Sequence, residues 1–584
     1  IIDNVQNPII GDSEGIHLVV PRSSTKECID FICKDLQTAA DYLPARWESE
    51  NKNFGRITSG AALALKGRVE LLYASPLFNR ADDVTRWETA YQTNLAAVKK
   101  LEEGNFGLAY ENNSGKNAAG WGKIFSDYIG SEGGGGTVSE AVLVTLYNNV
   151  SPAEHLQLEK WNGWEHSLRP ANAGGGGGMT PTAEMVDLFP MADGKKPNDM
   201  NGSYDYNQEL FFLNRDPRFY RTFAFPGVEW KFDSDDLKSF GEKGQLPYGI
   251  NGYTTGNNYK LWNYCWYDNV DDRNSNSKSG YAADCLGTKN TGIYLRKRTD
   301  DLALNSNPLY IFEKTSGNGF RQSAAPYMEI RFAEVLLNYA EAACGANHFD
   351  EAVNALKRIR KRVGYTDNCG LDPAIFNDRA KLFEAILYER QIELAYEGKR
   401  FHDVRRWMLF DGGVGQEALK STWKLTGFNG NTCNYLGVEP LNGQRRHRIE
   451  VYAKNFIAAK SNNVYNEDKT IKETYDELWN KRPTALSLTE DITCTESADD
   501  EITYADAKVK ALAQFYQEHF KRKNLSTDGN DETILPTFKP YYYILGFKKN
   551  AMQNNVSLEQ NIGWGDYWSG GADGTFDPLA ECIR

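Results

Sequence analysis

Apolar residues recur at helical spacing between Tyr327 and Trp407. The first segment, residues 327–345, carries one apolar face at i, i+3, i+4, i+7 and i+11, made of Phe332, Val335, Leu336, Tyr339 and Ala343. This spacing predicts an amphipathic helix, and Gly345 is expected at its C-cap because glycine tolerates a positive φ. A second amphipathic helix is predicted over residues 350–364. Two such helices joined by a tight turn form the αα-hairpin that is the unit of tetratricopeptide-like arrays.

The third segment, residues 382–407, places a charge inside an apolar stripe. Arg390 lies among Phe383, Ile386, Leu387 and Leu394, and a charge on a core-facing stripe must be paired to be tolerated. Glutamates spaced i, i+4 and i+8 supply carboxylates on an adjacent face. We therefore predict a partly buried charge ladder that joins the helix end, Gly398 and the next turn. Its members are Glu389, Arg390, Glu393, Glu397, Arg400, Asp403 and Arg406.

Further helices are predicted at residues 23–43, 57–79 and 85–104. Ser24 or Thr25 is expected to cap the first of them, since both residue types are favoured at N-caps, and Pro44 ends it. From about residue 105 to 325 the helical rhythm breaks, and the alternation in residues 139–149 predicts a strand. Helical periodicity returns at residues 509–523.

Composition excludes several classes of protein. A net charge of −13 over 584 residues argues against nucleic-acid binding, which needs a concentrated basic patch. No apolar run approaches the twenty residues of a membrane-spanning helix. The nine cysteines include no CxxC pair, so they indicate neither a zinc ribbon nor a disulfide framework. Aromatic residues make up 12% of the chain, which directs attention to the segments where they gather.

No pattern typical of catalysis or metal binding is present in the sequence. Glycosidases use paired carboxylates across an open cleft, whereas the Glu389, Glu393 and Glu397 ladder is matched by arginines and is typical of structure. The seven histidines form no HExxH or HxxxH pair. The acidic run at residues 268–276 lacks the spacing of an EF-hand. We therefore expect no catalytic residue, no metal site and no cofactor.

Two aromatic segments are the candidates for ligand binding. Residues 258–269 crowd Tyr259, Trp262, Tyr264, Trp266 and Tyr267 together, flanked by Asn and Asp. Trp161 and Trp164 form a second candidate, in the sequence WNGW. Sugar rings stack their apolar C–H faces on aromatic planes, while their hydroxyls pair with Asn, Asp and Arg. A buried strand or corner is the alternative for both segments. As a ligand surface, the first segment predicts that replacing Trp262 and Trp266 by Ala abolishes glycan binding without unfolding.

The sequence RFAEVLLNYAEA, followed by ERQIELAYEGKRFHDVRRW, closely resembles the C-terminal helical repeat of the SusD/RagB family. The similarity keeps order, spacing and residue type over roughly eighty positions. Residues 214–227 and 291–300 also resemble family segments, which implies a turn followed by a strand in the first and a strand in the second. Members of that family are glycan-binding lipoproteins on the outer membrane of Bacteroidota. The resemblance implies a glycan platform of aromatic residues on variable loops, a SusC-like TonB-dependent transporter as partner, and an N-terminal lipid anchor. Because the start IIDNVQNPII has no lipobox cysteine, we expect the family's N-terminal segment to be missing.

Taken with this resemblance, the patterns predict a mainly α-helical protein. Its SusD-like, tetratricopeptide-type scaffold would carry a loop-rich, partly β half that binds the ligand. The expected regions are 1–104 for helical repeats, 105–325 for the ligand-binding half, 326–410 for the C-terminal repeat core, and 411–584 for loops and short helices packed on that core.

The expected function is non-catalytic capture of an oligosaccharide at the outer face of the outer membrane. The protein would deliver this ligand to the transporter and act as its lid. Three alternatives stay open: capture of peptides by the same scaffold, a glycan-cleaving enzyme, and a helical scaffold that binds protein alone.

Overall fold

The structure of the chain is a computed structural model. The described residues are 9–10, 16–17, 21–48, 50–112, 118–126, 138–150, 160–170, 176, 178–230, 259–262, 292–299, 309–313, 319–454, 463–465, 471–474, 481–487, 507–526 and 535–580.

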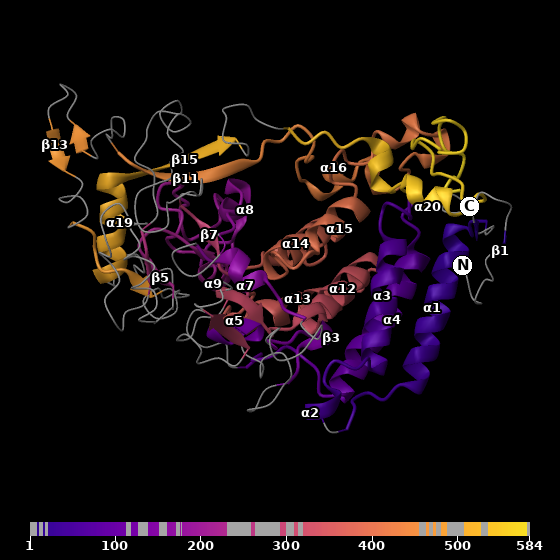
Figure 1. Cartoon of the computed structure of the whole chain (residues 1–584), viewed down its shortest axis with the longest axis horizontal. Coiled ribbons are helices and arrows are strands. Elements are labelled where there is room, and N and C mark those ends of the chain that lie inside the picture. Colours follow the sequence, from indigo (N-terminus) through magenta and orange to yellow (C-terminus); the bar gives the residue numbers. More distant parts are fainter. Residues whose placement is uncertain are drawn as a thin grey trace.

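Three long helices stand side by side at one end of the molecule (Figure 1). They are α1 (Thr25–Tyr42), α3 (Ser59–Ala74) and α4 (Val84–Glu103), with the short α2 (Glu50–Asn53) between the first two. All three were predicted from periodicity. Ser24 caps α1: its hydroxyl accepts from the Glu27 amide at 3.2 Å, and the Glu27 carboxylate accepts from the Ser24 amide at 2.8 Å. This reciprocal capping box satisfies two amides that would otherwise lack partners.

The predicted C-terminal repeat forms the centre of the molecule (Figure 1). It consists of α12 (Phe332–Gly345), α13 (Phe349–Arg362), α14 (Arg379–Glu393) and α15 (Arg400–Arg406). The prediction that the first helix includes residues 327–331 was wrong. Those residues form β10 (Tyr327–Arg331), which pairs antiparallel with β3 (Ala141–Thr145). The strand partner is more than 180 positions away in sequence, so local periodicity carried no sign of it.

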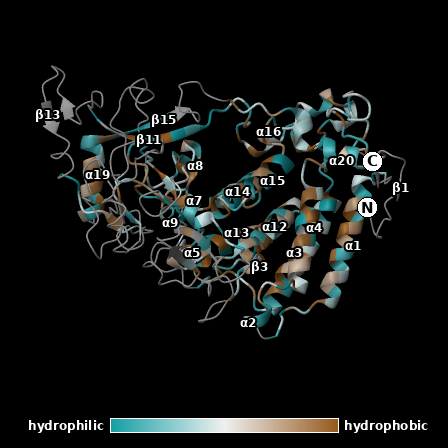
Figure 2. Ribbon diagram, in the orientation of Figure 1, coloured by the Kyte–Doolittle hydropathy of each residue, from teal (hydrophilic) through white to brown (hydrophobic). Residues whose placement is uncertain are grey.

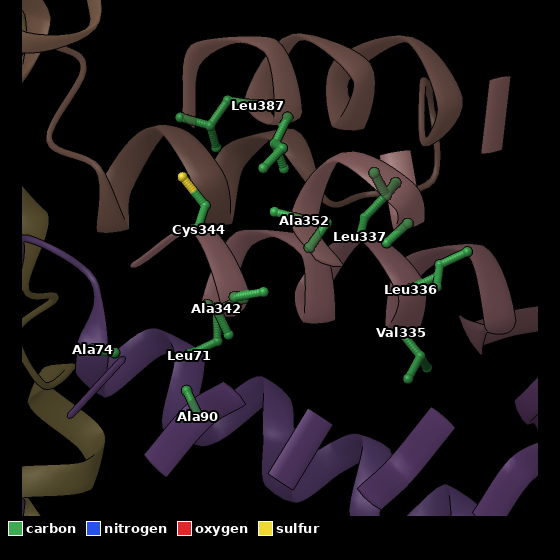
Figure 3. Packing of buried hydrophobic residues seen from close by; sticks show 14 of the residues in the cluster. Leu71, Ala74, Ala90, Val335, Leu336, Leu337, Ala342, Cys344, Ala352 and Leu387 are labelled. Carbon is green, nitrogen blue, oxygen red and sulfur yellow. The ribbon is translucent and has the colours of Figure 1, made fainter. Parts of the chain in front are cut away.

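The core of this half is built where α3 and α4 meet α12. In Figure 3, Leu71, Ala90 and Ala342 come together at that junction, and Leu387 approaches from α14. Small side chains allow the helices to approach closely. The closest approach is at Gly345, where an added Cβ would lie 2.2 Å from the Trp87 indole. Gly345 is therefore required for packing. The prediction that Gly345 caps the helix was wrong, because the cap residue is Ala346 and Asn347 takes the positive φ of +66°.

The other half is made of short helices and small sheets around an aromatic core. Strand β4 (Phe223–Ala224) pairs with β7 (Tyr294–Leu295), and β5 (Val228–Trp230) lies between β6 (Tyr259–Leu261) and β14 (Leu486–Ser487). Strand β8 (Tyr310–Glu313) pairs with β9 (Gly319–Ser323), and β11 (His447–Ala453) pairs with β15 (Phe520–Ser526) along its whole length. The remaining strands are β1 (Ile9–Ile10), β2 (Ile16–His17), β12 (Asn463–Tyr465) and β13 (Ile471–Thr474).

Two predictions for this half need correction. Residues 214–227 were expected to form a turn followed by a strand, but a helix, α9 (Pro217–Thr222), precedes the strand, which is limited to the two residues of β4. Asp216 accepts from the Arg218 amide at 2.8 Å and Pro217 occupies the first turn, which is a helix start that the sequence does contain. The helix predicted at residues 509–523 is α19 (Ala507–His519), and it ends where Phe520 begins to pair with β11.

Shorter helices complete the fold. They are α5 (Ala119–Ser126), α7 (Trp164–Leu168), α8 (Ala183–Leu188), α16 (Thr432–Leu436) and α20 (Lys549–Gln553), with 3₁₀ turns at Pro373–Ile375, Gln416–Ala418, Ser421–Trp423, Phe428–Gly430 and Pro540–Tyr543. Figure 2 shows hydrophobic and hydrophilic residues mixed along each long helix. Among the described residues, no helix has the length and apolar character needed to cross a membrane.

We expect Gly345→Ala to destabilise the protein by about 1–3 kcal/mol, the usual cost of overpacking a core, because the new methyl group would overlap the Trp87 ring. The free energy of unfolding from urea titration measures this effect. Gly163→Ala is the matched control, since nothing lies within 4 Å of a Cβ at that position. Equal stability of the Gly345 variant and the wild type would contradict the packing role.

Candidate functional site

The predicted ladder lies at the centre of a buried group of ion pairs, called here the central ion cluster. Five carboxylates and five cations share it: Asp216, Glu140, Glu389, Glu393 and Glu397 with Arg218, Lys297, Arg331, Arg360 and Arg362. All ten are buried. Because the charges balance in number, each loses its hydration but gains opposite neighbours, which is the condition for tolerating charge in a core.

Glu393 is the most connected member of the cluster. Its Oε1 accepts from Trp121 Nε1 at 2.9 Å and Arg331 Nη1 at 2.7 Å, and also from Arg362. Its Oε2 accepts from Arg218 Nη1 at 2.8 Å. Burial alone would raise the pKa of this carboxyl, but Arg362, Arg331 and Arg218 outweigh it and hold the pKa well below its usual range.

Glu397 connects the cluster to the loop-rich half. Its carboxylate accepts from Arg331 Nε at 2.7 Å and from Lys297 Nζ at 2.6 Å. Burial opposes ionisation, yet Arg331 and Lys297 together lower the pKa of Glu397 to about 2. The Lys297 ammonium also donates to the carbonyls of Glu393 and Ala395 at 3.1 and 2.9 Å. The chain around Lys297 is therefore fixed against the end of α14.

The rest of the predicted ladder forms a separate group on α12, α14 and α15. Arg390 Nε donates to Asp403 Oδ2 at 3.0 Å, and Arg406 Nη2 donates to Asp403 Oδ1 at 2.8 Å. Glu341 accepts from Arg406 Nη2 at 2.6 Å. Arg400 does not belong to either group, contrary to the prediction: it forms no ion pair within the described part of the chain and lines a groove on the other side of α15.

Beside Glu397 lies a small pocket of about 20 Å³, called here the Trp164 pocket. The residues that line it are Phe125, Asn162, Trp164, Glu165, Arg298, Tyr310, Ser323, Ala325, Pro326, Tyr327, Met328 and Glu397. Its wall combines aromatic rings with hydrogen-bonding groups, the composition expected of a surface that holds a sugar.

The aromatic wall of the pocket is held in place by hydrogen bonds and a cation–π contact. The Arg298 guanidinium lies over the Trp164 ring, with Cζ 3.8 Å from the ring centroid. Trp164 Nε1 donates to the Lys297 carbonyl at 3.1 Å. Arg298 Nη2 donates to the Tyr396 carbonyl at 2.9 Å, and Tyr327 Oη donates to the Glu397 carbonyl at 3.1 Å. The central ion cluster and this wall are thus built on the same two segments of backbone, one at Lys297 and one at Glu397.

One buried donor in the pocket has no partner. Arg298 Nε is buried and makes no hydrogen bond with any described group. Burial also lowers the pKa of Arg298, although the Glu397 charge opposes this. A buried unpaired N–H costs free energy unless something accepts from it.

The structure separates the predicted aromatic residues. Trp164 lines the pocket, whereas Trp161 does not; Trp161 is half-buried and donates from Nε1 to the Val150 carbonyl at 2.9 Å. Tyr259 belongs to β6. Tyr264, Trp266 and Tyr267 lie outside the described residues, as does the acidic run at 268–276. Within the part of the chain that is described, no group of three or more His, Cys, Asp and Glu side chains could hold a metal ion.

Trp262 is not available for stacking on a ligand, contrary to the prediction. It is 3% exposed and belongs to the aromatic core, with its ring edge-to-face against Phe515 at 5.7 Å between centroids. The alternative of a buried corner therefore holds for this residue. The density of aromatic residues along the sequence could not distinguish the two cases, because both core and ligand surface favour such residues.

Sequence reasoning did not identify most of the pocket. Asn162, Arg298, Tyr310 and Tyr327 come from four separate stretches of the described chain. Asn162 stands inside the WNGW motif and donates from Nδ2 to the Ala325 carbonyl at 2.9 Å. Arg298 adopts a positive φ of +69°, which is unusual for a residue with a side chain. No local pattern in the sequence indicates either property.

Comparison with known proteins gives the following similarities. Residues 122–564 match the sequence profile of the SusD family. SusD-like protein P2 of Formosa agariphila is 34% identical over 131 residues, which cover 20% of this chain and 25% of that protein. The matching region thus spans about a quarter of the length of this curated relative.

Solved structures show a shared fold. A SusD-like protein from Bacteroides fragilis is 21% identical with a TM-score of 0.52, over 97% of this chain and 75% of the other. A second structure, BT4246, is 18% identical with a TM-score of 0.55, over 95% of this chain and 79% of the other.

We expect stability to fall as pH decreases from about 4.5 to about 2. The pKa of Glu397 is about 2 in the folded protein and 4.5 ordinarily, so the unfolded chain takes up a proton first. Its contribution, on the order of 3 kcal/mol, is present above pH 4.5 and is lost as pH falls through 2. Urea midpoints measured across this pH range test the expectation.

Glu397→Gln should lose less stability than the wild type as pH decreases from about 4.5 to about 2. At pH 7 it should also cost about 3–5 kcal/mol, because Arg331 and Lys297 stay buried with one partner fewer. Glu417→Gln is the control, since Glu417 is exposed and its pairing with Lys424 spans 3.7 Å. A pH profile of Glu397→Gln identical to that of the wild type would contradict the assignment.

We expect Trp262→Ala to lower the free energy of unfolding by about 3–5 kcal/mol, as for other large-to-small changes of buried aromatic residues. Chemical denaturation followed by circular dichroism measures it. Unchanged stability, together with loss of ligand binding, would return Trp262 to the ligand surface.

Proposed function

The chain belongs to the SusD family, and from this premise we propose that it captures an oligosaccharide without cleaving it. The Trp164 pocket is the proposed binding site. The observation that carries the proposal is the Trp164 ring, which the Arg298 guanidinium holds in the wall of the pocket. The ring matches the apolar face of a sugar, and the guanidinium matches its hydroxyl oxygens.

The rigidity of the pocket supports capture. Trp164, Arg298 and Tyr327 are each held by a hydrogen bond to backbone. Side chains fixed before binding lose little conformational entropy when the ligand arrives. The pocket can therefore bind a sugar through few contacts.

A binding role also fits the state of the carboxylates. The glutamates at 389, 393 and 397 are buried and paired with cations. A retaining or inverting glycosidase needs two carboxyl groups that both reach the substrate. Glu165 and Glu397 line the Trp164 pocket, but each is buried and paired with a cation. We therefore expect them to serve as structural charges and to leave the bound sugar intact.

Delivery of the sugar to a SusC-like TonB-dependent transporter is the second part of the proposal. In it the protein acts as a lid at the extracellular face of the outer membrane, held there by an N-terminal lipid anchor. This part rests on family membership alone.

We expect Trp164→Ala to weaken binding of a neutral oligosaccharide at least tenfold, because aromatic anchors in pockets supply about 2 kcal/mol or more of binding free energy. Affinity electrophoresis against a panel of neutral polysaccharides would first select the ligand, and calorimetry would then give the dissociation constants. Chromatography of each mixture tests for cleavage.

Trp568→Ala is the matched control, since Trp568 is 47% exposed and lies on the C-terminal segment beside α20. Its affinity should stay within twofold of the wild type. Cleavage products would show an enzyme, and retardation of no polysaccharide while peptides bind would favour peptide capture.

A further inference from the structure

A second and larger hollow lies apart from the Trp164 pocket, and it shares no lining residue with it. This groove, called here the α15 groove, has a volume of about 1110 Å³ and lies between α8, α14, α15 and the segment 436–446. Met185, Leu188, Tyr388, Phe401, Val404 and Leu441 supply its apolar wall. A space of this size is larger than the usual small-molecule site, so it suits a chain of several units.

Three acidic residues of the groove wall have basic partners. Glu184 contacts His447 at 2.5 Å, Asp187 pairs with Arg522 at 2.6 Å, and Glu384 pairs with Lys196 at 2.5 Å. The Asp187 and Glu384 charges are thus each offset by an opposite charge.

Two arginines on the wall are different. The Arg400 guanidinium makes no hydrogen bond or ion pair within the described chain, and that of Arg446 makes one, to the Arg445 carbonyl at 3.2 Å. Both are half-buried. Burial lowers the pKa of Arg400; Asp403 opposes this shift and the positive charge of Arg446 adds to it. Glu439, an exposed acid on the same wall, pairs with neither of them within the described residues.

Arg400 and Arg446 line one groove and form no ion pair with a described carboxylate, so together they can serve as a site for an anion. The fork of N–H donors on arginine matches the oxygens of a carboxylate or a sulfate, and charge-assisted hydrogen bonds of this kind are about twice as strong as neutral ones. An anion between the two arginines would also remove their mutual repulsion.

The rest of the wall indicates what carries the anion. The side chains of Asn198, Gln208, Gln391 and Gln444 line the groove and make no hydrogen bond within the described chain. Amides of this kind can donate to and accept from hydroxyls. Phe401, next to Arg400, is 50% exposed and offers an aromatic face. No lining residue belongs to a described strand, so an extended peptide would find no strand edge to pair with.

We propose that the α15 groove binds an acidic saccharide, with its carboxylate or sulfate ester between Arg400 and Arg446 and a sugar face against Phe401. The site is additional to the Trp164 pocket. It rests on the proposed saccharide-binding function for the sugar part of the ligand, while the anion part stands on the two arginines. A carboxylate and a sulfate ester present similar oxygens to the guanidinium groups, and the experiment below distinguishes these two anions.

The test uses calorimetry of the full chain with five probes: a galacturonic acid tetrasaccharide, its methyl ester, a sulfated galactan tetrasaccharide, inorganic sulfate and a tetra-aspartate peptide. We expect saturable binding of one acidic tetrasaccharide and at least tenfold weaker binding of the methyl ester, since losing a charge-assisted pair costs about that factor. Arg400→Gln and Arg446→Gln should each weaken acidic binding at least tenfold. Thermal melting confirms that each variant is folded.

Arg445→Gln is the matched control, because Arg445 is the exposed neighbour of Arg446 and does not line the groove. It should change the affinity less than twofold. An equal loss in this control would show non-specific attraction and overturn the proposal. Peptide or inorganic sulfate bound as tightly as the acidic tetrasaccharides would also overturn it, as would no saturable binding of either tetrasaccharide.

The two proposed sites fail in distinguishable ways. Trp164→Ala should leave binding of the acidic tetrasaccharide unchanged, and Arg400→Gln should leave binding of the neutral ligand unchanged. If either variant lost binding of both ligands, that result would contradict the proposal of two separate sites. Failure of the neutral ligand alone would remove the Trp164 pocket and leave the groove in place.

Discussion

The central ion cluster is the interaction on which the rest of the structure depends. Glu393 receives donors from α5, α9, β10 and α13, so one carboxylate at the end of α14 joins elements from both halves of the protein. Each member is buried, and a buried charge is tolerated only while its partners remain. The two halves are therefore held in one arrangement more strictly than hydrophobic contact would require, since apolar surfaces can slide and repack.

The same cluster determines the shape of the proposed binding site. Lys297 is bound to the end of α14 by three acceptors, and its own carbonyl accepts from Trp164. Arg298, the next residue, covers the Trp164 ring. The position of the proposed ligand surface thus follows from a structural charge network a few residues away.

The sequence predicted what depends on neighbouring residues and missed what depends on distant ones. The helices α1, α3 and α4 follow from periodicity and caps, and the Ser24 capping box is a local signal. The glutamates of the ladder were identified from their spacing, but their partners Arg218, Lys297 and Arg362 lie far away in sequence and have no common pattern. Trp262 was misplaced because a buried ring and an exposed ring look alike in a sequence. Gly345 was misread because its reason, the Trp87 ring, belongs to another helix.

The separation of the cluster partners along the chain has a consequence for how the protein folds. Arg362 meets Glu140 across 222 positions, and Arg218 meets Glu393 across 175. Contacts that close such long loops form late and slow the search for the native state. The helical hairpin of α3 and α4 can form while the chain is still incomplete, but the cluster cannot form until α14 has been made. We expect the unpaired charges of these residues to stay hydrated in the partly folded chain, which keeps its inner surfaces soluble until the last element docks.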